Sequence, residues 1–422
     1  MNNDGTRPAR LSNKPKNIRY HNQKLVTSLF RTADVLSVSE ISEKINLSKT
    51  TVTKMMGDFV ARGLIKSAGK GSSTDEGGKK PELFELNADY AYIVVLVLRY
   101  ESGLMQIDGA VVDMKCRVLH KALEKVEEPR SYEGTIKQLA DVTVKMAQDM
   151  NIPQEKICTV TLGFAGVCDA DNGIIYYPMY PGWPRDLPAR ADMEAALPFE
   201  TAVYIDNDSR FRGYSVLQTE ENRQLQSIAI ISSGTRAGGC ILENHALNRG
   251  VNGFVGEFGH MVVEPYSKEQ CSCGGYGCFE SMVSTDTVLR RAYEVCDNYP
   301  HSAIYQAAKD KTLEMQDVFA AAKQGDVLAT LLMDRVIHYF SILIHNIMLV
   351  CDPSKFIIQG AFTQAGDYFL DHIREEVNAF PFFNIKSQLN ISFSPVPWKE
   401  AFYVGAALYA THRFYNDDEL YN

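Results

Sequence analysis

The sequence lacks the features of a membrane protein or an exported protein. No apolar run reaches the ~18–20 residues that a helix needs to span a bilayer, so we expect no membrane segment. The N-terminus is polar and basic without an apolar core, so we expect no secretory signal there. No self-similar period of solenoid length occurs, which excludes a repeat protein. The 422 residues are enough for two or three domains, which we expect in the cytoplasm.

A disulfide framework is not expected either. The chain has nine cysteines, an odd number, and we expect no export signal in it. Cysteines in that context favour reduced thiols and metal binding over disulfide bonds. Hydrophobic residues make up 45% of the chain and charged residues 23%, as in ordinary globular proteins.

Charge is unevenly distributed along the chain. Residues 1–86 contain 15 Lys and Arg against 9 Asp and Glu, whereas the remainder contains 28 against 43. The basic N-terminal part and the acidic remainder indicate that only the N-terminal part binds a polyanion. A chance asymmetry is the alternative.

The first twenty residues predict a flexible basic arm. Residues 1–20 carry five Lys and Arg against one Asp, and Pro8 and Pro15 interrupt any helical pattern. Such an arm can touch phosphates, or it can be a disordered tail without a partner.

Residues 21–86 predict a winged helix-turn-helix domain. Helices are expected over residues 22–33, 38–45 and 49–62, with a turn before the third. Strands over residues 64–65 and 83–86 would form the wing. The N-terminal end of such a third helix reads base edges in the major groove. A small helical linker domain is the alternative. The predicted DNA-contacting residues are Ser48, Lys49, Thr50, Thr51, Thr53 and Lys54 on the third helix, with Lys79 and Lys80 at the wing tip.

Residues 87–422 alternate strands and helices in two halves. This pattern predicts an α/β body with two lobes and a cleft. Small residues around Gly166 allow a ligand to approach the backbone, although a tight core turn would also use them. Asn207 and Asp208 follow a strand, where an Asn-Asp pair can bond two sugar hydroxyls. A capping Asp that opens the next helix is the alternative.

Four metal-binding side chains fall within residues 260–278. They are His260, Cys271, Cys273 and Cys278. One imidazole and three thiolates suit tetrahedral Zn²⁺ and leave no position for water, so the metal would be structural. Unligated thiols in a glycine-rich loop are the alternative. Glu257 and Glu280 flank this set, and rigid carboxylates suit hydrogen bonding to vicinal hydroxyls; either could equally be a surface charge.

These motifs resemble one family. Gly-Glu-x-Gly-His at residues 256–260, followed by Cys-x-Cys-Gly-x-x-Gly-Cys-x-Glu at residues 271–280, resembles the signature of the ROK family of repressors and sugar kinases. The resemblance implies that the His and three Cys bind zinc, and that both Glu and the His face a sugar. It implies a two-lobed, actin-like body of the ribonuclease H-like type. Gly-Gly-Lys-Lys-Pro at residues 77–81 resembles the wing of the family's repressors, such as those of the N-acetylglucosamine and xylose type.

The sequence departs from the kinases of that family in its nucleotide loops. The hairpin that carries Asp-x-Gly-Gly-Thr in the kinases falls on residues 98–103, where one glycine remains. Arg236 replaces a glycine of the second phosphate loop, and Met179 replaces an Asn that contacts sugar. Asp208 matches the kinase general base. We therefore expect a non-catalytic homologue in which Asp208 is vestigial.

The sequence thus predicts a transcriptional regulator, most simply a repressor of genes for carbohydrate uptake or catabolism. It would bind a double-stranded operator as a homodimer or tetramer, hold structural zinc, and respond to a sugar or sugar phosphate in the cleft. The predicted effector-binding residues are Gly166, Asn207, Asp208, Glu257, His260 and Glu280. An active sugar kinase with an appended head and a regulator controlled by a protein partner are the alternatives. The sequence does not identify the sugar, the operator or the sign of regulation.

Overall fold

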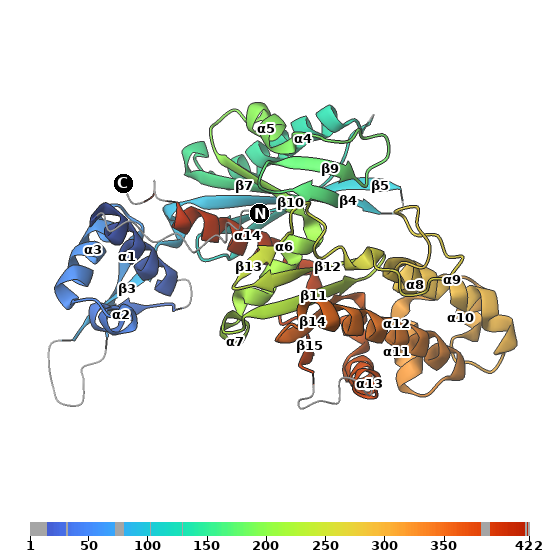
Figure 1. The fold of residues 1–422 in the computed structure, drawn as a ribbon. Helices are drawn as coiled ribbons and strands as arrows, with labels where there is room; N and C mark the ends of the chain where they lie inside the picture. Colours follow the sequence, from blue (N-terminus) through green and yellow to red (C-terminus); the bar gives the residue numbers. More distant parts are fainter. Residues whose placement is uncertain are drawn as a thin grey trace, which may run out of the picture.

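The computed structural model describes residues 15–30, 33–71, 80–101, 103–128, 130–380, 389–417 and 420. Figure 1 shows a small head formed by the N-terminal elements and a body of two lobes. Each lobe is built on its own five-stranded sheet.

The head contains three helices, α1 (Pro15–Phe30), α2 (Val38–Ile45) and α3 (Lys49–Ala61). Ser37 and Glu40 form a capping box at the start of α2, and the Ser48 hydroxyl accepts a hydrogen bond from the Thr51 amide at the start of α3. Asn46 ends α2 in the left-handed conformation. These local signals set the tight turn before α3.

Helix α1 begins earlier than predicted. It starts at Pro15, so residues 15–20 of the predicted arm are helical, and residues 1–14 lie outside the described part. Proline at Pro15 fits because the first helical position needs no amide hydrogen bond. The prediction of an arm over residues 1–20 is therefore wrong for its last six residues.

A three-stranded sheet completes the head, in the order β1 (Leu36–Ser37), β3 (Glu82–Leu86), β2 (Ile65–Lys70). β2 and β3 form an antiparallel hairpin that pairs Lys70 with Glu82, so its first strand is longer than predicted. Lys79 and most of the hairpin tip lie outside the described residues. The helices and the sheet share one core that includes Val26, Ile41 and Phe59.

The first lobe has the strand order β10-β7-β4-β5-β6. Strands β4 (Tyr92–Glu101), β5 (Leu104–Asp113) and β6 (Val118–Lys125) are antiparallel, whereas β7 (Ile157–Phe164) and β10 (Ala202–Asn207) run parallel to β4. Helices α4 (Tyr132–Asp149) and α5 (Ala189–Ala196) cover one face, as Figure 1 shows. A small hairpin, β8 (Gly166–Asp169) with β9 (Ile174–Pro178), follows β7.

The second lobe repeats the same pattern in the order β13-β12-β11-β14-β15. The strands are β11 (Ser227–Ser233), β12 (Ala237–Glu243), β13 (Ala246–Asn248), β14 (Lys355–Gly360) and β15 (Ile391–Phe393). Short helices α6 (Asp208–Tyr214) and α7 (Glu220–Arg223) connect the two lobes. The remaining helices are α8 (Phe279–Val283), α9 (Thr285–Val295), α10 (Tyr305–Lys309), α11 (Met315–Lys323), α12 (Val327–Cys351) and α13 (Asp367–Asn378).

Helix α12 is long and apolar enough to cross a bilayer by length and composition alone. Asp334 and Arg335 interrupt its apolar sequence, and 61% of its most apolar window is buried inside the protein. Phe340 packs edge-on against Phe279 and Phe369 in the core of the second lobe. In this fold α12 is a core helix.

The last helix, α14 (Trp398–Asn416), connects all three parts. Phe402 packs between the two sheets, and at Gly405 a Cβ atom would lie 1.7 Å from the carbonyl oxygen of Phe211, so only glycine fits. The far end of the helix reaches the head, where Tyr415 belongs to the head core. Figure 1 shows this helix running from between the lobes to the head.

Candidate functional site

A cavity of about 950 Å³ lies between the two lobes. Both lobes line it, the first through the ends of β4, β7 and β10 and the second through the β11–β12 turn and the loop after β13. The structure brings all six predicted effector-binding residues to this cavity: Gly166, Asn207, Asp208, Glu257, His260 and Glu280.

Asn207 stands at the end of β10 and caps α6. Its Oδ1 accepts from the Ser209 amide at 2.9 Å, and its Nδ2 donates to the Gly166 carbonyl at 2.8 Å. Gly166 has a φ of +129°, and a Cβ there would lie 2.1 Å from the Tyr177 carbonyl oxygen. The capping role that the sequence allowed for Asp208 therefore belongs to Asn207, whose amide keeps one N–H and one lone pair for a ligand.

Asp208 is the first residue of α6 and is paired one turn later. Arg212 Nε lies 3.5 Å from its Oδ2, and the Arg212 guanidinium lies 4.2 Å from the centroid of the Trp398 ring. The Arg212 side chain is only 4% exposed, and burial lowers its pKa. Sequence reasoning missed this arginine, although the spacing of four residues on a helix is the signal that reveals such pairs.

A buried network of charges lies behind the cavity wall. The Asp206 carboxylate is fully buried between Arg210, at 3.2 Å, and Arg249, at 2.5 Å. Arg210 also lies 3.2 Å from Glu257 and donates to the carbonyl of Gly253. These pairs hold the loop after β13 against the first lobe, and sequence reasoning missed them as well.

Glu257 offers a test by pH. Burial raises the pKa of its carboxyl above the ordinary value of 4.5, and Arg210 and His260 offset this only in part. A carboxyl whose pKa is raised by folding contributes stability below its unfolded pKa, and loses that contribution as pH rises through the folded pKa. We therefore compare the free energy of unfolding of Glu257→Gln with that of the wild type. The difference, variant minus wild type, is expected to increase as the pH rises above about 4.5. Urea unfolding across pH measures this difference, and a difference that is constant or falls with pH would contradict it.

Glu280 connects the cavity to the cysteine-rich loop. Its Oε2 accepts from the Ala237 amide at 3.0 Å, and its Oε1 accepts from the Ser272 hydroxyl at 2.6 Å. The side chain is buried at the start of α8. A displacement of Ser272 would therefore move a carboxylate that faces the ligand space.

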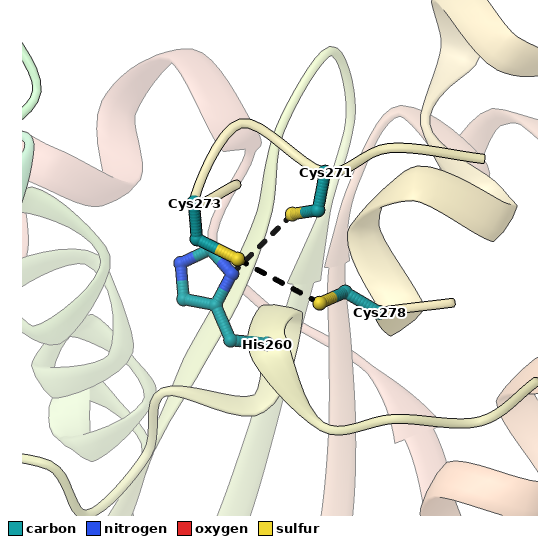
Figure 2. Close-up of side chains that lie close together, drawn as sticks. All are labelled: His260, Cys271, Cys273 and Cys278. Atoms are coloured by element: carbon teal, nitrogen blue, oxygen red, sulfur yellow. Dashed lines mark hydrogen bonds between the residues drawn. The ribbon is translucent and has the colours of Figure 1, made fainter. Parts of the chain in front are cut away.

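Four metal-binding side chains converge beside this carboxylate, as Figure 2 shows. His260 comes from a short 3-10 turn, Cys271 and Cys273 from the following loop, and Cys278 from the residue that precedes α8. Their ligand atoms all lie within 4.8 Å of one another. His260 Nδ1 lies 3.5 Å from Cys271 Sγ, and Cys273 Sγ lies 3.7 Å from Cys278 Sγ.

The spacing of these atoms fits Zn²⁺. Zn–S and Zn–N distances of about 2.3 and 2.0–2.1 Å give tetrahedral edges of about 3.8 Å between two sulfurs and about 3.5 Å between sulfur and nitrogen. Burial and the neighbouring thiols raise the pKa of Cys278 to about 12, so a cation that bound here would have to displace thiol protons. His260 also lines the cavity, so one imidazole faces both sites.

The predicted DNA-contacting residues of α3 are exposed, whereas its apolar residues face the head core. Val52, Met55, Met56 and Phe59 of α3 are buried, and the predicted residues on that helix are exposed. The Ser48 hydroxyl is engaged as the helix cap. Lys80 is exposed at the base of the hairpin, and Lys79 lies outside the described residues.

A model of the ROK family matches residues 100–412. The chain belongs to the ROK family. The xylose repressor of Bacillus subtilis is 24% identical over 89% of this chain and 90% of its own length. The glucokinase of Halalkalibacterium halodurans is 29% identical over 57% of this chain and 73% of its own length. A crystal structure of a ROK family transcriptional regulator, a homolog of the E. coli MLC protein, superposes with a TM-score of 0.75 at 20% identity, covering 94% of this chain and 97% of its own.

Membership of the ROK family confirms the predicted α/β sugar-kinase-type body. The alignment with the repressor is longer than the body alone, so it extends into the head. Two arginines, Arg99 and Arg236, line the cavity from the positions where ROK kinases were expected to carry their phosphate loops. The two lobes therefore have the sugar-kinase-type fold, and two arginines line the part of the cavity where the kinases' phosphate loops are expected.

Proposed function

We propose that this ROK protein is a cytoplasmic transcriptional repressor of carbohydrate uptake or catabolic genes. The head would bind a double-stranded operator as a winged helix-turn-helix, with the exposed N-terminal end of α3 in the major groove. The observation that carries the proposal is the similarity to a xylose repressor over 89% of the chain, head included. The exposed Lys49 and Lys54 on α3 supply positive charge where such a domain meets DNA.

The effector would be a sugar or sugar phosphate bound between the lobes. Asn207, Asp208, Glu257 and Glu280 would accept or donate hydrogen bonds to its hydroxyls, with Gly166 beside the ring. His260 would orient one ring nitrogen to the ligand because the other faces the thiols. All of these residues line one cavity, which supports the proposal.

Zinc would be structural in this protein. His260, Cys271, Cys273 and Cys278 would hold it, and a closed four-ligand site supplies rigidity without a position for substrate. That rigidity would fix Glu280 through Ser272 and fix the His260 ring. Both side chains belong to the proposed sugar-binding wall.

Effector binding would reach the DNA through closure of the lobes. Helix α14 begins with Trp398 in the cavity wall, and near its other end Tyr415 lies in the head core, so movement of one lobe would displace the head. In a homodimer or tetramer this would change the separation of two heads, which must match half-sites about 34–36 Å apart or a multiple of this. A coupling of roughly 1–3 kcal/mol is enough for a usable switch.

Operator binding can be tested on α3. A duplex selected from random sequence by the protein would be titrated by fluorescence anisotropy at several salt concentrations. We expect Lys49→Ala with Lys54→Ala to lower the slope of log affinity against log salt by about two, because each lysine neutralises about one phosphate. Lys137→Ala, an exposed lysine on α4, is the matched control and should leave the slope unchanged. An unchanged slope in the double variant would exclude this face as the DNA-binding surface.

An active sugar kinase is the second candidate, since Asp208 is present in the cavity. Its pairing with Arg212 disfavours this function, because a general base needs a free carboxylate near the substrate hydroxyl. A coupled assay with ATP, Mg²⁺ and a panel of hexoses decides between the two. Turnover that Asp208→Asn abolishes would replace our proposal with the kinase. A protein partner in place of a small molecule is the remaining alternative, and calorimetry with the same sugars tests it.

A further inference from the structure

Four arginines line the cavity between the lobes, and two of them form ion pairs with carboxylates of the protein. They are Arg99, Arg185, Arg212 and Arg236. Arg99 lies 2.6 Å from Asp108, and Arg212 lies 3.5 Å from Asp208. A bound anion would therefore have to compete with these carboxylates for the Arg99 and Arg212 guanidinium groups.

The other two arginines have no close carboxylate partner among the described residues. Arg236 Nη1 lies 3.9 Å from Glu280, at the limit of an ion pair, and its side chain is 44% exposed. Arg185 is exposed and lies over the Tyr177 ring at 4.7 Å, and no carboxylate within the described residues forms an ion pair with it. Both guanidinium groups can accept an anion without breaking an existing strong pair.

Four carboxylates line the cavity, and three of them, Asp208, Glu257 and Glu280, already have partners within the protein. Glu257 is paired with Arg210, and Glu280 accepts from the Ala237 amide and the Ser272 hydroxyl. They can still accept from sugar hydroxyls, because each carboxylate has about four lone-pair positions. Asp186 also lines the cavity, and among the described residues Arg185 and Arg236 are the cavity arginines without an ion pair shorter than 3.9 Å.

The two arginines come from opposite lobes. Arg185 stands in the loop between β9 and α5 of the first lobe, and Arg236 stands in the β11–β12 turn of the second. Closure of the lobes on a neutral ligand would bring two like charges toward each other, which opposes closure. A bound anion would reverse the sign of this interaction, because each guanidinium can donate two parallel hydrogen bonds to one oxyanion.

We infer that the effector is an anionic carbohydrate whose phosphate or carboxylate group is bound between Arg185 and Arg236. This inference rests on the proposed function, since it assumes that a small carbohydrate occupies the cavity. The hydroxyls of that carbohydrate face the carboxylates and His260, and its anionic group faces the two arginines.

Isothermal titration calorimetry of the full chain tests this inference. The probes are glucose, mannose and N-acetylglucosamine, their 6-phosphates, glucuronate, and inorganic phosphate. We expect at least one anionic sugar to bind about ten-fold or more tightly than its neutral counterpart. Whether a 6-phosphate or glucuronate shows the larger preference identifies the phosphate or the carboxylate as the anionic group.

Substitutions separate the charge preference from binding of the sugar ring. Arg236→Gln and Arg185→Gln are each expected to remove most of the preference, and neither should weaken binding of the neutral sugar, because each removes one of the two like charges that oppose closure. Arg236→Lys should keep part of the preference, because charge remains but the bidentate geometry is lost. Arg290→Gln on α9 is the matched control, since Arg290 is also 44% exposed but lies outside the cavity.

The outcomes distinguish this inference from the proposal on which it rests. Equal affinity for neutral and anionic sugars would overturn the inference alone. Inorganic phosphate that bound as tightly as every sugar phosphate would also overturn it, because the sugar ring would then contribute nothing. No binding of any probe would overturn the small-molecule control of this protein and the inference with it.

Discussion

Cys271→Ser is expected to release zinc and to lower the stability of the second lobe. Structural zinc contributes roughly 10–16 kcal/mol in isolated zinc-finger peptides. Here the loss should be smaller, because Phe279 and Met282 remain in the lobe core without the metal. We expect at least about 3 kcal/mol, which corresponds to a fall in Tm of about 6–12 °C for a unit of this size.

The same substitution should also impair the cavity. Glu280 accepts a hydrogen bond from Ser272, and His260 is shared between the thiol cluster and the cavity. Differential scanning fluorimetry, zinc analysis by mass spectrometry and calorimetry with the sugar panel measure the three effects. Cys351→Ser is the matched control, because Cys351 lies outside the cluster. A zinc-free variant with wild-type Tm and wild-type sugar affinity would refute the structural role of the metal.

Arg210→Met is expected to destabilise the protein by about 3–5 kcal/mol, because it removes one partner from a buried ion pair. The Arg210 side chain is 1% exposed, and the Asp206 carboxylate beside it is fully buried. Methionine fills much of the same volume, so the loss reports the charge and its hydrogen bonds more than packing. Arg249 would still neutralise Asp206 in part, but Glu257 and the Gly253 carbonyl would lose their donor.

Urea unfolding of the wild type and the variant measures this loss. Arg212→Met is the comparison, since Arg212 is nearly as buried but its partner Asp208 is 29% exposed and can be hydrated. We expect the smaller effect there. A loss below about 1 kcal/mol for Arg210→Met would show that the network contributes no more than a surface ion pair.

The elements that sequence reasoning placed well are those with strong local signals. The helices predicted over residues 38–45 and 49–62 and the strand predicted over residues 83–86 lie within one residue of α2, α3 and β3. The metal cluster was equally predictable, because three cysteines within eight residues of one loop lie close together in most loop conformations. Periodicity and capping are local properties, so a single sequence contains them.

The arginine networks were not predicted, for a physical reason. Arg210 and Arg249 meet at Asp206 only because the loop after β13 folds back onto the first lobe, 43 residues along the chain from Asp206. Sequence spacing does not reveal contacts of that kind. The start of α1 was misplaced because Pro15 was interpreted as a helix breaker, whereas proline is well tolerated in the first turn.

The position of Tyr415 has a consequence for synthesis of the protein. The head is translated first, but its core includes a ring from the far end of the chain. In nascent chains still on the ribosome, the core of the head therefore lacks the Tyr415 ring. Chains that end before Tyr415 never complete that core. If the head binds an operator as proposed, we expect chains that lack Tyr415 to bind it more weakly than the full-length polypeptide.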